Sequence, residues 1–531
     1  MNNKYSIFSS PLQTKKLRYG CAGCPLTRRQ FFKLGCAASA GLACGLATSV
    51  PAIGAAAKRL RLRVIYSLHG PKQTGPDWPN KGFDFEPVMR RFNNMLAQKF
   101  PEMEFIPSMA NGPEQAQKLV DADKAAPVDG YVVFQMNCWN RVVQTVAATG
   151  KPLLYVDFQY AGSGGFLAYT AAFLRQQAPN VGFVASSRTD DLLAAVRCFN
   201  LLSKGGTASD FAAATAQIRR ERTPKPGSMA VKKDAVQTLP IAECIKRLGE
   251  SKILAVRGTQ AGPAEPVFGI PVVHVPFAEL NEAWKNADQD EAQVIALKWE
   301  KGASRIAGVD WSTLVNCAAM YLAEKAVMKK HGANAITINC LGGFYGGHIH
   351  AYPCLGFHQL NNEGLVGGCE CDVRSTATML AFSILTKGRP GYISDPVIDT
   401  SKRQIIYAHC VASNRVFGPD CKPNPYQILT HSEDRQGASV RSIMPLGYMT
   451  TTLEVQPGRK EILMHQGKAV ANDPDDRACR TKLCVEPVGD IEKLFTFWDQ
   501  WGWHRVTFYG DIKEPVMALA DAMGWKVIME A

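Results

Sequence analysis

The sequence lacks a long run of lysine and arginine residues with aromatic side chains between them. Such runs supply the phosphate contacts and the base-stacking surfaces of nucleic-acid-binding proteins. The net charge of +13 does not replace them, because residues 1–57 hold seven of the 60 basic residues and no acidic residue. The remaining chain holds 53 basic and 47 acidic residues, a net charge of +6. We therefore expect no nucleic-acid partner.

Two further features are missing. Gly162-Ser-Gly-Gly165 does not have the glycine spacing of a dinucleotide-binding loop, so we predict no nucleotide site there. The apolar run Leu34–Val50 is short and rich in alanine and glycine, which does not suit a stable membrane span in the mature chain.

Residues 1–57 have the pattern of an export signal. Thr27-Arg-Arg-Gln-Phe-Phe-Lys33 has the twin-arginine form, and the weakly apolar run after it ends in small residues that offer a cleavage site near Ala55 or Ala57. The pattern predicts a protein that folds in the cytoplasm and is exported to the periplasm. An unprocessed amphipathic tail or a retained membrane anchor is the alternative interpretation.

Cysteine is abundant, with 16 residues, and five of them surround one stretch of the chain. These five are Cys340, Cys354, Cys369, Cys371 and Cys410. Three roles are open for them: small buried apolar side chains, a disulfide, or soft metal ligands. We expect the first role in a chain that folds before export.

The order of predicted elements indicates an α/β protein. Short apolar strands alternate with amphipathic helices from residue 58 to about 400, which predicts two Rossmann-like doubly wound domains, 58–178 and 179–400. Ligands gather at the carboxyl ends of strands in such sheets, and the loop Gly70–Pro79 follows one of these ends. From 401 to 531 short β-type runs, Gln427–His431 among them, are separated by glycine and proline, which predicts a C-terminal domain containing an antiparallel β-barrel.

The stretch from Glu370 to Asp395 carries a carboxylate at each end. Asp372 is a favoured helix-start residue, and apolar residues recur after it at helical spacing. A helix over 373–386 rises about 21 Å, and an extended segment over 388–395 returns a similar distance at about 3.3 Å per residue. The two carboxylates are therefore predicted to lie together, where they repel unless a cation or a proton separates them. A divalent metal site is one interpretation, and a helix-cap acid with an unrelated turn acid is the other.

The C-terminal part of the chain carries a series of further motifs. They are Cys369-Glu-Cys-Asp372, Gly391-Tyr-Ile-Ser-Asp395, Tyr407-Ala-His-Cys410, Thr430-His-Ser-Glu-Asp-Arg-Gln-Gly437, Pro445-Leu-Gly447 followed by Thr450-Thr-Thr452, and Trp503-His-Arg-Val-Thr-Phe-Tyr-Gly510. By their order and spacing, the region from about residue 335 onward resembles the L-fucose isomerase / L-arabinose isomerase superfamily, and its fucose-isomerase-like branch in particular.

This resemblance implies a metal-dependent aldose–ketose isomerase that acts on a sugar through an enediol, with manganese or another divalent cation as cofactor and a homo-oligomeric assembly. It implies Glu370 and Asp395 as metal ligands that also move the proton, and His504 as the third ligand. The residues predicted to line the sugar pocket are His409, His431 and Trp503. A metal that chelates both sugar oxygens stabilises the enediolate, and a carboxylate can take and return the carbon-bound proton.

Two other classes of function remain open at this stage. The first is an exported sugar-binding protein that has kept the fold and lost catalysis, because Rossmann-like pairs with a cleft also make good binders. The second is a metal or thiolate enzyme of another class that uses the cysteine cluster. The metal that the purified protein holds distinguishes all three.

Overall fold

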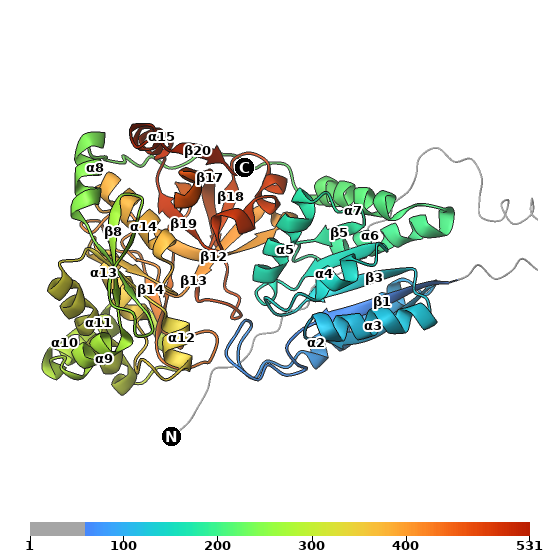
Figure 1. The fold of residues 1–531 in the computed structure, drawn as a ribbon, viewed down its shortest axis with the longest axis horizontal. Helices are drawn as coiled ribbons and strands as arrows, with labels where there is room; N and C mark the ends of the chain where they lie inside the picture. The colour runs from blue at the N-terminus through green and yellow to red at the C-terminus, as the bar shows by residue number, and fades with distance from the viewer. Residues whose placement is uncertain (1–58) are drawn as a thin grey trace, which may run out of the picture. The chain divides into compact units, whose positions relative to one another are not determined.

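The computed structural model describes residues 59–531, so the predicted export signal lies outside the described residues. Within this range the chain forms two five-stranded sheets, a closed barrel and one small three-stranded sheet (Figure 1). The predicted fold class is confirmed: the sheets are mainly parallel, with helices around them, and the C-terminal part contains an antiparallel barrel of six strands.

The first sheet is entirely parallel and has the strand order β2-β1-β3-β4-β5. Its strands are β1 (Leu60–Ser67), β2 (Met103–Ala110), β3 (Gly130–Gln135), β4 (Leu153–Asp157) and β5 (Val181–Val184). Every residue of β3 and β4 is buried, as expected of central strands covered on both faces.

Two separate hydrophobic cores cover the two faces of this sheet. Val64 and Val132 belong to one core and Ile65 and Val133 to the other, because neighbouring residues of a strand point to opposite faces. The helices on the first face are α2 (Glu86–Lys99), α6 (Thr189–Arg197) and α7 (Ala208–Arg222). Those on the second face are α3 (Pro113–Ala125), α4 (Val142–Ala147) and α5 (Ser163–Arg175).

The second sheet has the order β11-β10-β6-β8-β7, with only the edge strand β7 antiparallel. Its strands are β6 (Ile253–Val256), β7 (Gly262–Val267), β8 (Ile270–Val275), β10 (Ala335–Ile338) and β11 (Val366–Gly368). The helices of this region are α8 (Ile241–Glu250), α9 (Phe277–Lys285), α10 (Gln289–Gly302), α11 (Trp311–His331), α12 (Cys340–Tyr345), α13 (Cys354–Asn362) and α14 (Val373–Leu385).

The barrel closes because β16 pairs with both β19 and β17. Its strands are β12 (Tyr392–Asp399), β13 (Gln404–His409), β16 (Met449–Gln456), β17 (Glu461–Asn472), β18 (Thr481–Pro487) and β19 (Arg505–Tyr509). After α15 (Lys513–Ala522), the short strand β20 (Lys526–Met529) adds to β17 in parallel.

A buried polar network crosses the barrel interior. Tyr407 on β13 hydrogen-bonds His465 on β17, and Thr452 on β16 donates to Tyr407 at 3.1 Å, although none of these strands are neighbours in the ladder. Glu530, just after β20, accepts from His465 Nδ1 at 2.8 Å and from Arg505 Nη2 at 2.8 Å. The side chains of Arg505 and Glu530 are fully buried.

Helix α14 joins the second sheet to the barrel. It packs against β10 and β11 and also against β16, β12 and β19. Most of its residues are therefore buried, which explains why the sequence is apolar or small around most of the helix. Among residues 59–531, no helix combines the length and the apolar character that crossing a membrane requires.

Candidate functional site

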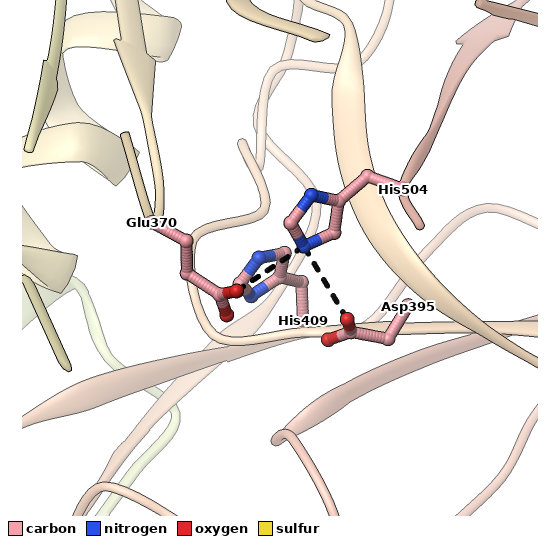
Figure 2. A group of neighbouring side chains, drawn as sticks. All are labelled: Glu370, Asp395, His409 and His504. Carbon is pink, nitrogen blue, oxygen red and sulfur yellow. Dashed lines mark ion pairs between the residues drawn. The ribbon is translucent and has the colours of Figure 1, made fainter. Parts of the chain in front are cut away.

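Four side chains from distant parts of the chain meet beside the N-terminus of α14 (Figure 2). Glu370 lies in the turn between β11 and α14, Asp395 on β12, His409 at the end of β13, and His504 directly before β19. One nitrogen or oxygen atom from each lies within 4.8 Å of the corresponding atoms of the other three. The structure thus places Glu370 and Asp395 side by side, as the helix-and-return geometry predicts.

The turn that presents Glu370 is strained. Glu370 and the next residue, Cys371, both have left-handed backbone conformations, with φ of 61° and 53°. A non-glycine residue in this region costs on the order of 1 kcal/mol or more, and such residues concentrate at functional sites. The turn reverses the chain between β11 and α14, so that the carboxylate points to the barrel strands.

His504 is the hub of the cluster. Its Nε2 lies 3.3 Å from Asp395 Oδ1 and 3.5 Å from Glu370 Oε2. Its Nδ1 donates to Asp372 Oδ2 at 2.9 Å, and the other oxygen of Asp372 accepts the backbone N–H of Ser375 at 3.0 Å as the N-cap of α14. A carboxylate that holds Nδ1–H fixes the ring and leaves Nε2 to face the cluster, which is how metal-binding histidines are commonly held.

The second histidine has the opposite orientation. His409 stacks on His504 with ring centroids 5.6 Å apart, and its Nδ1 accepts the backbone N–H of Cys410 at 3.0 Å. In a neutral imidazole this places the proton on Nε2, which faces the cluster. His409 is therefore suited to donate a hydrogen bond to an oxygen, whereas His504 is suited to bind a cation.

The electrostatics of the cluster favour a positive charge. Burial opposes the charged form of His504, but its hydrogen bonds to Asp372, Asp395 and Glu370 outweigh burial and raise its pKa well above the usual value. The Nε2 atoms of His504 and His409 are buried and have no hydrogen-bond partner. Two carboxylates and an imidazole nitrogen form a donor set that suits a divalent cation such as manganese, so the residues present fit the predicted cofactor.

A cavity of about 120 Å³ opens beside this cluster. Its lining consists of carboxylates, aromatic rings and one thiol: Asp77, Trp78, Cys138, Trp139, Glu370, Asp395, Glu433 and Trp503. The Trp503 indole N–H donates to Asp395 Oδ1, and the Trp139 ring lies edge-on to the Trp503 ring at 5.5 Å. Acidic and aromatic groups in one small cavity suit a polyhydroxylated ligand, which needs both hydrogen-bond acceptors and apolar faces.

The predicted pocket residues do not all reach this cavity. Trp503 lines it and His409 belongs to the four-residue cluster, whereas His431 lies behind Tyr345, whose hydroxyl is 3.5 Å from His431 Nδ1. The predicted roles of these residues in binding a sugar stay predictions.

The structure adds residues that the sequence did not single out. Asp372 was predicted only as a helix start, and Glu433 stands inside a quoted motif without any spacing that marks it as a pocket residue. Asp77 and Trp78 belong to the strand-end loop Gly70–Pro79, so the rule that ligands gather at strand ends did indicate their region.

The cysteines near the site are free thiols in the described chain. Cys340, Cys354, Cys369 and Cys410 are buried, and the Sγ atoms of Cys340 and Cys369 lie 3.2 Å apart. Of the three roles left open, the structure agrees with small buried side chains.

Asp372→Asn is expected to weaken metal binding and to preserve the helix. Asparagine still caps α14 through its carbonyl oxygen, but the amide that replaces Oδ2 cannot accept the proton of His504 Nδ1. Loss of such a supporting carboxylate typically costs about 10- to 100-fold in metal affinity. Titration of the metal-free protein with Mn²⁺ measures this loss.

Asp310→Asn is the matched control, because Asp310 caps α11 in the same way, accepting from the Thr313 backbone N–H at 2.7 Å, far from the cluster. Its manganese affinity should stay at the wild-type value. An equal loss in both variants would mean that Asp372 acts only as a helix cap.

Comparison with known proteins gives one consistent name. No protein-family model matches the chain. It is 24% identical to the sulfoquinovose isomerase of Clostridium sp. (strain MSTE9) over 266 residues, which are 48% of this chain and 57% of that protein. It is 23% identical to the sulfoquinovose isomerase of Priestia aryabhattai over 196 residues, 35% of this chain and 44% of that protein. The sulfoquinovose isomerase of Alkalicoccus urumqiensis matches at 24% over 165 residues, 29% of this chain and 35% of that protein.

The matched parts thus cover between 35% and 57% of these curated relatives. Among solved structures, a carbohydrate transporter from Acidothermus cellulolyticus in complex with myo-inositol matches at 14% identity, covering 55% of this chain and 79% of that one, with a TM-score of 0.17, which carries no argument. The curated relatives agree with a sugar isomerase; membership of the fucose-isomerase-like branch stays a prediction.

Proposed function

We propose that this protein is an aldose–ketose isomerase that acts on a sugar, and that it depends on a divalent cation held by Glu370, Asp395 and His504. The observation that carries the proposal is the convergence of two carboxylates and the imidazole of His504, whose buried Nε2 has no hydrogen-bond partner, beside a small acidic and aromatic cavity. The names of the curated relatives support the same reaction class. Manganese is the proposed cation, because carboxylate ligands with one imidazole suit it.

The chain supplies defined groups for this reaction. When bound, the cation supplies the positive charge that stabilises an enediolate. Glu370 and Asp395 flank the position of the reacting carbons, and one of them takes the proton from one carbon and returns it to the next. His409 Nε2–H donates a hydrogen bond to a sugar oxygen, and Trp503 offers its ring to an apolar face of the sugar while its N–H orients Asp395.

The remaining proposals concern the setting of the enzyme. We propose export by the twin-arginine signal within residues 1–57 to the periplasm, and a homo-oligomeric state. Fractionation of cells that express the full chain tests the first proposal, and the mass of the purified protein in solution tests the second.

The direct test is a panel of aldoses, sulfoquinovose included, incubated with purified protein and added Mn²⁺. Ketose formation that a chelator abolishes and Mn²⁺ restores is the expected result. Ketose formation that survives chelation and metal analysis would contradict the metal dependence. Thermal stabilisation by a sugar without any ketose, with the metal bound, would favour the sugar-binding alternative over the isomerase.

A further inference from the structure

Glu433 is a third carboxyl group at the cavity, and the metal cluster does not use it. It lines the cavity together with Glu370 and Asp395, yet it is not among the four clustered side chains. Among residues 59–531, no lysine, arginine or histidine forms an ion pair with it. Its one side-chain hydrogen bond comes from the Tyr345 hydroxyl, which donates to Oε2 at 3.1 Å. A structural role in an ion pair therefore does not explain this side chain.

The backbone holds Glu433 firmly in position. Its carbonyl oxygen accepts the backbone N–H of Lys81 at 2.6 Å, which ties the loop to the strand-end loop of the first sheet. The preceding turn is closed by hydrogen bonds from the backbone N–H of His431 to the carbonyl of Gln436 at 2.7 Å and from that of Arg435 to the carbonyl of His431 at 3.1 Å. A rigid loop that presents one carboxyl group to a cavity is typical of a preorganised functional group.

A chain of polar groups leads away from Glu433. Tyr345 contacts Glu433 on one side and His431 Nδ1 at 3.5 Å on the other, and His431 Nδ1 lies 3.6 Å from Asp434 Oδ1. Each of these side chains can gain or lose a proton or can pass one along a hydrogen bond. The arrangement connects the cavity to a group that can exchange a proton.

Aldose–ketose conversion requires two proton movements. One proton leaves C2 and one is added at C1, while O1 gains a proton and O2 loses one. Glu370 and Asp395 are the groups proposed for the carbon-bound proton, and cation binding occupies their lone pairs. A further carboxyl group with no cation to bind is suited to the oxygens.

We propose that Glu433 is a further catalytic residue, which moves the proton between the two sugar oxygens; this rests on the proposed isomerase function. Its carboxyl proton goes to the carbonyl oxygen O1 as the base removes the proton from C2, so that the C2–H electron pair becomes the C1–C2 double bond. The Glu433 carboxylate then takes the proton from O2 as C1 receives a proton, the O2–H pair forms the new carbonyl, and Glu433 returns to its starting state. No oxidant or reductant is needed. Tyr345 is a positioning residue for Glu433.

The protonation of Glu433 agrees with this role. Burial raises its pKa to about 8, and the negative charges of Glu370 and Asp77 add to the rise, while His431 and the hydrogen bond from Tyr345 oppose it. Cys479 is the remaining titratable group that senses its charge. Glu433 is therefore protonated at neutral pH and can act as a proton donor.

The test compares Glu433→Gln with the wild-type protein. We expect kcat to fall about 10²- to 10⁴-fold, the range of general acid–base catalysis, with the Mn²⁺ content and the sugar-induced thermal shift unchanged. In ²H₂O the variant should incorporate more deuterium into recovered aldose for each ketose formed, because exchange at carbon continues while transfer between the oxygens is blocked. The decline of wild-type kcat above about pH 8 should be absent.

Two further variants separate the outcomes. Tyr345→Phe should lower kcat less and move the alkaline decline to higher pH, because it removes a hydrogen bond that lowers the pKa of Glu433. Glu363→Gln is the matched control, since Tyr321 donates to Glu363 at 2.6 Å in a similar pair elsewhere, and it should keep the wild-type kcat. An active wild-type protein with undiminished kcat in Glu433→Gln would overturn this inference alone. A wild-type protein that isomerises no aldose would overturn both it and the proposed function.

Discussion

Replacing Glu370 by glutamine is expected to abolish both manganese retention and turnover, with kcat/KM lower by about 10³-fold or more. Glutamine has nearly the same shape, so the strained turn at φ 61° is kept. What changes is the charge: one of the two carboxylates near His504 Nε2 becomes a neutral amide. A divalent cation then loses a charged ligand, and the proton of the substrate loses a base.

Metal analysis after gel filtration and the initial rate with saturating Mn²⁺ measure the two effects separately. Glu363→Gln serves as the control, because Glu363 pairs with Tyr321 and Lys325 outside the cluster. Full activity and full metal content in Glu370→Gln would refute its assignment as a ligand and base.

Replacing Glu530 by glutamine is expected to lower the free energy of unfolding by about 3–5 kcal/mol. Glu530 and Arg505 form an ion pair at 2.8 Å with both side chains fully buried, and His465 also donates to Glu530. The amide leaves the Arg505 charge inside the barrel without a counter-charge, which costs far more than the loss of an exposed pair. Urea or thermal denaturation measures the change.

Glu461→Gln is the matched control for this prediction. Glu461 pairs with Arg459 at 2.6 Å on the partly exposed edge of the barrel, and exposed pairs contribute only about 0–1 kcal/mol. A similar loss in both variants would mean that the buried pair has no special contribution.

The same carboxylate predicts a pH dependence of stability. Burial opposes the ionised form of Glu530, but the charge of Arg505 and the hydrogen bond from His465 outweigh it and lower the pKa from 4.5 to about 2. The unfolded state therefore binds the proton first, so the stabilisation is present above pH 4.5 and is lost as the pH falls from 4.5 to about 2. In Glu530→Gln this part of the acid dependence should be missing.

The sequence predicted the fold well where local pattern and global packing agree. The predicted helix over 373–386 is α14 (Val373–Leu385), capped by Asp372 as the sequence indicates. The buried strands Ile253–Val256 and Ala335–Ile338 also match, because continuous apolar runs are typical of parallel strands covered on both faces. The run Gln427–His431 behaves differently: most of it forms β14 (Tyr426–Leu429), which pairs with β9 (Arg305–Ala307) and β15 (Ser439–Ser442) outside the barrel. Short β-type runs carry no information about which strand they pair with.

The candidate site shows the same limit. Glu370 and Asp395 could be brought together from chain geometry because only one helix and one strand separate them. His504 is more than 100 residues further on, and only the family resemblance connected it with the carboxylates. Asp372 and Glu433 were not identified as site residues, since their contacts with His504 and Tyr345 depend on packing between separate sheets.

The location of the cluster has a consequence for the apo protein. Glu370 comes from the turn that ends the second sheet, whereas Asp395, His409 and His504 come from the barrel, so the four side chains span a seam between two independently hydrogen-bonded bodies. A cation there acts as a staple, and mass action adds its binding energy to the cohesion of the seam. Stripped of the ion, the molecule should breathe first along this line, and the Glu370–Cys371 reversal, already under backbone tension, would be the first stretch to relax.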